Sequence, residues 1–176
     1  MMLFKDTDYI EEFKKIKHDG KFFEVLENMK NEEQAVNFLA KIDKRISHFV
    51  NHLQRKHPND KRIKRFHKLK NRKIIEPELI KDTSSYTINK GEILAFCVRL
   101  KSDHTKFHDE DILDFVIIHE LAHVISKSIG HTQEWLSNFK FLLHSLAESN
   151  IYIPIDYSKK NDNYCGIVVT NNPYFN

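Results

Sequence analysis

Two histidines four positions apart, His119 and His123, lie in the most apolar stretch of the chain. In a helix their side chains are one turn apart on the same face, so both imidazoles can bind one metal ion. Glu120 stands beside this row and is placed to take a proton from a water molecule at the metal. The pattern therefore predicts a hydrolytic metal site with two ligands and a general base.

The apolar residues around this motif predict that its helix is buried. Carboxylates at 109–111 suit the positive end of a helix dipole and Gly130 is a natural stop, so we expect a helix from about Asp111 to Ser128. Buried polar groups are costly unless they are hydrogen bonded or ligated. A metal explains the two histidines and the glutamate; the alternative is two histidines that are merely hydrogen bonded in a core.

A catalytic zinc ion takes three protein ligands and leaves a fourth position to water. His131 follows Gly130, where the chain can reverse, and helical spacing predicts a second helix after it. Antiparallel packing of that helix on the first one brings His131 back toward the metal. Glu134 is the competing third ligand, and we favour His131. The apolar positions of the second helix are Trp135, Leu136, Phe139, Leu142, Leu143 and Leu146.

This arrangement resembles the SprT-like and WLM metallopeptidases, which include the Spartan-type proteases that degrade proteins crosslinked to DNA. Their pattern is His-Glu-x-x-His, a short spacer, a small residue and a His, then a Phe or Trp; Gly130, His131 and Trp135 match it. Thr132 departs from it, because the family often has glycine there. The resemblance covers residues 86–157. It implies a zincin-like α+β fold with a small antiparallel or mixed sheet, Zn²⁺ as the cofactor and a protein or peptide substrate.

Composition narrows the class of protein further. A chain of 176 residues suits one domain, and its apolar runs are too short to span a membrane. The N-terminus turns charged at Lys5, too early for a secretory signal. Cys97 and Cys165 are the two cysteines, so we expect neither a disulfide framework nor a Cys-based zinc ribbon. An intracellular protein, cytoplasmic or nuclear and not secreted, is expected from this. Nothing in the sequence indicates an oligomeric state.

The chain divides into four expected parts of one domain. These are an N-terminal helical part (1–56), a basic connecting segment (57–82), a catalytic core (83–157) and a C-terminal tail (158–176).

Helical spacing is expected to dominate the N-terminal part. Apolar residues from Ile10 to Leu26 carry that spacing, with a break at Asp19-Gly20, and a longer helix is predicted from about 32 to 53. His48 and His52 are one turn apart in the longer helix but lack an adjacent Glu. We interpret them as surface or boundary residues.

A run of positive charge follows that helix. Between Arg55 and Lys73 there are ten Lys or Arg and one acidic residue, Asp60. Apolar residues at every third position, 63, 66 and 69, predict a helix that docks through them and turns its basic side outward. Such a face is typical of contact with a nucleic-acid backbone, and a solvated helix face is the ordinary alternative. The candidate nucleic-acid contacts are Lys61, Arg62, Lys64, Arg65, Lys68 and Lys70.

The β-structure is expected between Thr83 and Leu100. Residues 86–88 and 93–100 flank Asn89-Lys90-Gly91, which is a hairpin signal. The second strand is apolar on both faces, so we expect helices to cover it. A strand near the metal can also pair with an extended substrate. Residues 164–170 are predicted to form a last strand.

The expected function is that of a zinc-dependent endopeptidase, in which His119, His123 and His131 bind Zn²⁺ and Glu120 is the base. DNA-associated or DNA-crosslinked proteins are the substrates that the resemblance implies. One alternative is a zinc-binding module that contacts nucleic acid or protein without hydrolysis; another is a metallohydrolase for a different bond. Glu120 favours an enzyme, because a structural site has no use for a general base.

Two supporting roles stay open at this point. The candidates to stabilise the oxyanion are Tyr152, Tyr157 and Tyr164, and the sequence does not choose among them. Cys165 is interpreted as a buried structural residue, the alternative being an inhibitory metal ligand that replaces water.

Overall fold

The computed structural model of the protein describes residues 12–79 and 83–176. The strands are β1 (Phe13–His18), β2 (Lys21–Leu26), β3 (Lys73–Ile75), β4 (Tyr86–Ile88), β5 (Ile93–Ala95), β6 (Asp162–Tyr164) and β7 (Ile167–Val169). The α-helices are α1 (Glu32–Lys56), α2 (Glu110–Ile125) and α3 (Gln133–Glu148), and the 3-10 helices are η1 (Ile63–Leu69) and η2 (Pro173–Phe175). The expected α+β class is confirmed. Within the described ranges, each helix falls short of the length and apolarity that a membrane crossing needs.

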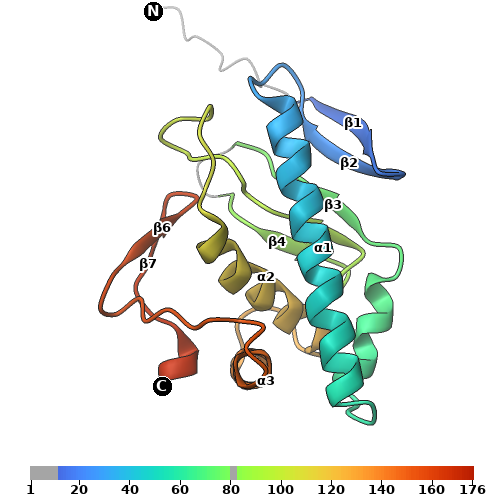
Figure 1. The fold of residues 1–176 in the computed structure, drawn as a ribbon, viewed down its shortest axis with the longest axis vertical. Coiled ribbons are helices and arrows are strands. Elements are labelled where there is room, and N and C mark those ends of the chain that lie inside the picture. The colour runs from blue at the N-terminus through green and yellow to red at the C-terminus, as the bar shows by residue number, and fades with distance from the viewer. Residues whose placement is uncertain (1–11, 80–82) are drawn as a thin grey trace, which may run out of the picture.

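Five strands form a mixed sheet in the order β1-β2-β3-β5-β4 (Figure 1). The two outer pairs, β1 with β2 and β5 with β4, are antiparallel, whereas β3 runs parallel to both β2 and β5. The β6–β7 hairpin is a separate two-stranded sheet. Figure 1 shows this hairpin beside α2, apart from the large sheet. Strand β4 therefore ends the large sheet on the side of α2.

The helices cover one face of the sheet. Phe23, Ile74 and Leu94 point toward them and are buried, whereas Phe22 on the opposite face is 59% exposed. The predicted burial of both faces of the segment from 93 to 100 is confirmed for residues 94–99, whereas Ile93 at its start is only half-buried. Regular pairing also ends at Ala95, and residues 96–98 continue as buried irregular chain.

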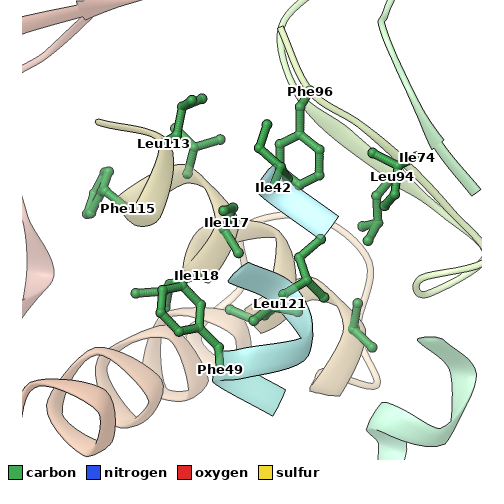
Figure 2. Packing of buried hydrophobic residues seen from close by; sticks show 14 of the residues in the cluster. Ile42, Phe49, Ile74, Leu94, Phe96, Leu113, Phe115, Ile117, Ile118 and Leu121 are labelled. Atoms are coloured by element: carbon green, nitrogen blue, oxygen red, sulfur yellow. The ribbon is translucent and has the colours of Figure 1, made fainter. Parts of the chain in front are cut away.

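Helix α2 lies at the centre of the hydrophobic core. Eleven of its 16 residues are buried, which confirms the expectation of a helix that is apolar nearly all round. Figure 2 shows Ile117 and Leu121 of α2 facing Ile42 of α1, with Phe49 next to Ile118. Each such side chain contributes roughly 1.5–3 kcal/mol by burial. The position of α2 is therefore set by packing from several elements at once.

The N-terminal part differs from its expectation. Residues 13–26 form the β1–β2 hairpin, not helix, so the helical interpretation of that spacing is wrong; Ile10 lies outside the described residues. Asp19 and Gly20 both have positive φ, 47° and 81°, as a two-residue hairpin turn requires. Six-residue segments are too short for apolar spacing to separate helix from strand. The predicted long helix is confirmed as α1.

The two cysteines form a disulfide, Cys97–Cys165, with Cα atoms 6.1 Å apart. This single bond is not a disulfide framework, but it was not expected from the sequence, and Cys165 has no free thiol for a metal. The partners are 68 residues apart in sequence, so their spacing held no signal. Folding brings the exit of β5 to the turn between β6 and β7. The inference of a reducing compartment loses the support that it drew from unpaired cysteines.

A buried ion pair joins the sheet to the segment before α2. Nε of Arg99 lies 2.7 Å from Oε1 of Glu76, and both side chains are almost fully buried. The other carboxylate oxygen of Glu76 accepts the N–H of Leu26, and Arg99 donates to the carbonyls of Lys30 and His104. One pair thus connects the ends of β2 and β3 with the loop that leads to α2.

Arg99→Met should destabilise the protein by about 3–5 kcal/mol, because it leaves the carboxylate of Glu76 buried without its partner. Lys41→Met is the matched control. It breaks the exposed pair Lys41–Glu110, which contributes about 0–1 kcal/mol. Urea unfolding of the three proteins measures both changes. Equal midpoints for the two variants would contradict the structural role of the buried pair.

Candidate metal centre

The last two turns of α2 carry the predicted metal-binding motif. The helix ends at Ile125, three residues before the predicted end, because Ser126 adopts an extended backbone. The hydroxyl of Ser126 donates to the carbonyl of Ala122 at 2.7 Å and accepts from the amide of Asn138 in α3 at 2.9 Å. Gly130 has the expected positive φ of 83° but lies in the loop, not at the helix end.

Glu134 fixes the loop between α2 and α3. Its carboxylate accepts the backbone N–H groups of Lys127 and Ser128 at 3.0 and 2.9 Å. These hydrogen bonds lower the pKa of Glu134 to about 2. Thr132 caps α3 by accepting the N–H of Trp135, so His131 is held between the loop and the helix. The competing ligand Glu134 is engaged in loop structure instead.

The structure brings His119, His123 and His131 together. One potential ligand atom of each side chain lies within 4.8 Å of the others. The ring centroids are 5.1 Å apart for His119 and His123, and 5.0 Å apart from His131 in both cases. His119 and His123 are half-buried, and His131 is exposed. His48 and His52 lie on α1 and do not join this group.

Trp135 packs against all three imidazoles. It stacks on His123 with an interplanar angle of 26°, and its ring centroid lies 4.4 Å from that of His131 and 4.9 Å from that of His119. An aromatic wall of this kind restricts the rings to orientations in which they converge. The sequence marked Trp135 as a family feature, and the tertiary structure gives it this contact.

The electrostatic environment suits metal ligation. Burial lowers the pKa of His123 to about 4 and lowers the pKa of His131 as well, with help from the neighbouring imidazoles. Both rings are therefore neutral at pH 7, and a neutral imidazole is the form that binds a metal. Three converging imidazoles at a half-open site fit a metal ion that keeps one position for water.

Glu120 is held next to the triad with its side chain buried. One carboxylate oxygen accepts the hydroxyl of Thr87 at 2.6 Å, and the other lies 3.1 Å from Nδ1 of His119. Burial by itself raises the pKa of Glu120, but the hydrogen bonds with His119 and Thr87 outweigh it, so the pKa is lowered. The carboxylate is thus ionised and able to accept a proton. Sequence reasoning missed Thr87, because only the strand register places it here.

A cavity of about 140 Å³ opens beside His119 and Glu120. Its walls come from the segment before β4, from α2 and from the β6–β7 hairpin. The residues around it are Ser84, Ser85, Phe115, Val116, His119, Glu120, Tyr164, Ile167 and Val169. Residues that were expected to belong to a tail after the catalytic core therefore form one wall of the site.

The basic segment docks as predicted, through Ile63, Phe66 and Leu69 of η1, which are all buried. It is a 3-10 helix. Arg62 is partly engaged within the fold: its guanidinium binds Asp60 at 2.8 Å and lies 3.8 Å from the ring centroid of Phe141, although 38% of the side chain stays exposed. The residues around one surface hollow of the segment are Lys61, Lys64, Arg65, His67 and Lys68, and Lys70 is exposed next to them.

This basic segment lies next to the end of α2. Leu69 packs against the turn at Gly91 so closely that a Cβ there would lie 2.7 Å from its Cδ2 atom. Lys90 in the same turn donates to the carbonyls of His123 and Ser128. The positive charge of η1 is therefore close to the loop that presents His131.

Three viral proteins are similar to this chain in sequence. "Uncharacterized protein R325" of Acanthamoeba polyphaga mimivirus is 31% identical over 150 residues, which cover 82% of this chain and 76% of that protein. Protein 136R of Invertebrate iridescent virus 6 is 38% identical over 85 residues, and protein 042R of Invertebrate iridescent virus 3 is 36% identical over 91. These two matches cover 48% and 51% of this chain and about half of each relative, 48% and 54%. No family model matches the chain.

Two crystal structures of Wss1 from Saccharomyces cerevisiae, one of them a mutant, share the fold. Both superpose with a TM-score of 0.52, at 18% identity for the mutant and 19% for the other. The matches cover 73% and 72% of this chain and 92% and 88% of Wss1. The chain therefore shares the fold of Wss1, in agreement with the expected fold.

His131→Ala should lower metal affinity at least tenfold, because it removes one of three protein ligands. Glu134→Gln is the matched comparison and should lower metal affinity much less, since Glu134 binds the loop backbone and not the metal. Elemental analysis and chelator competition on the purified variants measure both. Metal loss in Glu134→Gln with retention in His131→Ala would reverse the assignment.

Proposed function

We propose that this chain, which belongs to the same protein family as the mimivirus protein R325, is a zinc metallopeptidase of the WLM and SprT-like type. The observation that carries the proposal is the convergence of three imidazoles beside the buried carboxylate of Glu120. The likeness to Wss1 supports the WLM side of the resemblance. We treat the chain as one catalytic domain.

His119, His123 and His131 are the residues that would hold Zn²⁺, which when bound lowers the pKa of water and polarises a carbonyl. Glu120 accepts a proton as the water oxygen attacks the carbonyl carbon of the peptide bond. It then delivers this proton to the amide nitrogen as the C–N bond breaks, so the products are a carboxylic acid and an amine, and at neutral pH the acid gives its remaining proton to the amine. Thr87 keeps the carboxylate of Glu120 oriented through both transfers.

Strand β4 supports a peptide substrate. It ends the order of the large sheet, so one of its edges has no strand partner among the described residues. Thr87 in this strand touches Glu120, which places the strand beside the reacting centre. An extended peptide that adds to such an edge presents its backbone to the metal site.

The basic segment supports a nucleic-acid partner, and hence protein substrates that are associated with or crosslinked to DNA. Lys61, Lys64, Arg65 and Lys68 share one surface hollow and are free to contact phosphates. Arg62 is partly engaged by its contacts with Asp60 and Phe141, so we assign it a smaller part in this role. Such substrates imply action inside the cell, in the cytoplasm or nucleus.

Glu120→Gln should retain the fold and the metal and reduce peptide cleavage by roughly 10²–10⁴-fold, because an amide does not accept the proton. The assay measures cleavage of a DNA-binding protein in the presence and in the absence of DNA, together with elemental analysis of the same samples. Metal loss in this variant would show that Glu120 is a ligand.

The same assay separates the peptidase from its alternative. If the wild type binds metal and DNA but cleaves no more substrate than Glu120→Gln does, the result would favour a zinc-binding interaction module.

Arg65→Glu and Lys68→Glu should weaken DNA binding, with the salt dependence reduced by about one counterion per lost phosphate contact. Lys160→Glu makes the same charge change at an exposed position in the loop before β6 and should bind like the wild type. Titrations at two salt concentrations measure affinity and slope. Equal affinities for all four proteins would remove DNA from the proposal.

A further inference from the structure

The wall of the cavity beside His119 and Glu120 includes a phenol that can act as a hydrogen-bond donor. When water attacks a peptide carbonyl, negative charge develops on the carbonyl oxygen, and a preorganised donor there is worth roughly 10²–10³ in kcat. Tyr164 lines the same cavity as His119 and Glu120. Its side chain therefore borders the space that a substrate carbonyl would enter.

The other two candidate tyrosines are placed elsewhere. The hydroxyl of Tyr152 accepts from Asn172 at 2.9 Å in a buried contact. Tyr157 packs against Phe115, and its hydroxyl has no hydrogen-bond partner among the described residues. Neither of the two lines the cavity. The structure thus separates three tyrosines that are equivalent in the sequence.

Hydrogen bonding leaves the phenol proton of Tyr164 available. The hydroxyl of Ser85 is in contact with the phenol oxygen and already accepts the N–H of Cys97 at 3.3 Å. Ser85 can therefore donate its own proton to the phenol oxygen, and the proton of Tyr164 is free to point into the cavity. Burial raises the pKa of Tyr164, so the phenol keeps that proton.

The disulfide holds both sides of this contact. Cys165 follows Tyr164 directly, and its disulfide partner Cys97 donates to Ser85. Cys165 has a φ of 52° in the two-residue turn with Gly166, a position that favours Asn, Asp or Gly. Cysteine is therefore an unfavourable residue for this backbone conformation, and at this position it forms the disulfide with Cys97.

The β6–β7 hairpin has few other attachments. It does not pair with the large sheet, and Ile167 and Val168 are more than half exposed. Tyr164 itself is buried: its hydroxyl contacts Ser85, its ring lies 4.9 Å from that of His108, and the N–H of Cys165 donates to His108 at 3.1 Å. The disulfide is the covalent link among these contacts that hold Tyr164.

We propose that Tyr164 is a catalytic residue that donates a hydrogen bond to the scissile carbonyl oxygen, and that the Cys97–Cys165 disulfide holds it in place. This inference rests on the proposed peptidase function. A dithiol reductant would break the S–S bond, give two protein thiols and itself become a disulfide. The hairpin would then be released and the donor lost, so peptidase activity depends on the redox state of the chain.

Tyr164→Phe tests the first half of the proposal. We expect kcat to fall roughly 10²-fold with KM and metal content unchanged, because the lost bond forms in the transition state. Tyr157→Phe is the matched control and should behave as the wild type, since its hydroxyl has no partner among the described residues. A kcat for Tyr164→Phe within threefold of the wild type would overturn the role.

Affinity for a phosphinic peptide is a second readout, independent of turnover. The tetrahedral phosphinate imitates the charged carbonyl oxygen, so metal-loaded Tyr164→Phe should bind it at least tenfold more weakly than the wild type. If the wild type cleaves peptides and Tyr164→Phe binds the phosphinate as tightly as the wild type, this inference alone is refuted. If the wild type neither cleaves peptides nor binds the phosphinate, the peptidase proposal is refuted as well.

Cys97→Ser combined with Cys165→Ser tests the second half, because it removes the bond without a reductant that also binds metal. This double variant should lose kcat as Tyr164→Phe does, and adding Tyr164→Phe to it should cause no further loss. Treating the wild type with a dithiol, followed by metal reloading, should give the same loss and keeps the test valid if the serine variant misfolds. The link between the disulfide and Tyr164 would be refuted if the loss of kcat in the triple variant equals the product of the separate losses, or if the wild type keeps full activity after reduction.

Discussion

The burial of α2 is the constraint on which the candidate site depends. Three polar side chains, His119, Glu120 and His123, project from a helix that apolar packing holds on most sides. Since the helix cannot shift without opening the core, its neighbours are positioned relative to it. Thr87 reaches Glu120 from the sheet, and His131 reaches the other histidines from the loop after α2. A rigid element of this kind keeps a constellation within the tolerance that catalysis needs.

Two nearby residues in the segment before α2 attach it to opposite parts of the molecule. Arg99 joins it to Glu76 and thus to the ends of β2 and β3, and Cys97 joins it to the β6–β7 hairpin. The entry to α2 is therefore anchored to the large sheet and to the wall of the cavity. This arrangement explains how a hairpin near the C-terminus can be part of a site that is built on a central helix.

Some basic side chains stabilise the fold, and others stay at the surface. Within the basic segment, Arg62 is engaged by Asp60 and Phe141, whereas its neighbours remain at the surface. Lys90 links the adjoining turn to the carbonyls at the end of α2. A count of positive charges therefore overestimates the groups that are free to bind a phosphate, because some of them hold the fold together.

Local pattern determined much of this protein. The spacing of apolar residues was sufficient for α1 and α3, the apolar stretch after the carboxylates at 109–111 indicated α2, and Asn89-Lys90-Gly91 indicated the hairpin at 86–95. The motif alone placed His119 and His123 on one face. Short apolar segments left helix and strand unresolved at 13–26, where the structure has a hairpin. Tertiary structure alone decided the rest: the placement of His131 rather than Glu134 beside the other histidines, Thr87 on Glu120, and the bond between Cys97 and Cys165. These contacts join residues whose separation in the chain carries no periodic signal, so only the packing of whole elements brings them together.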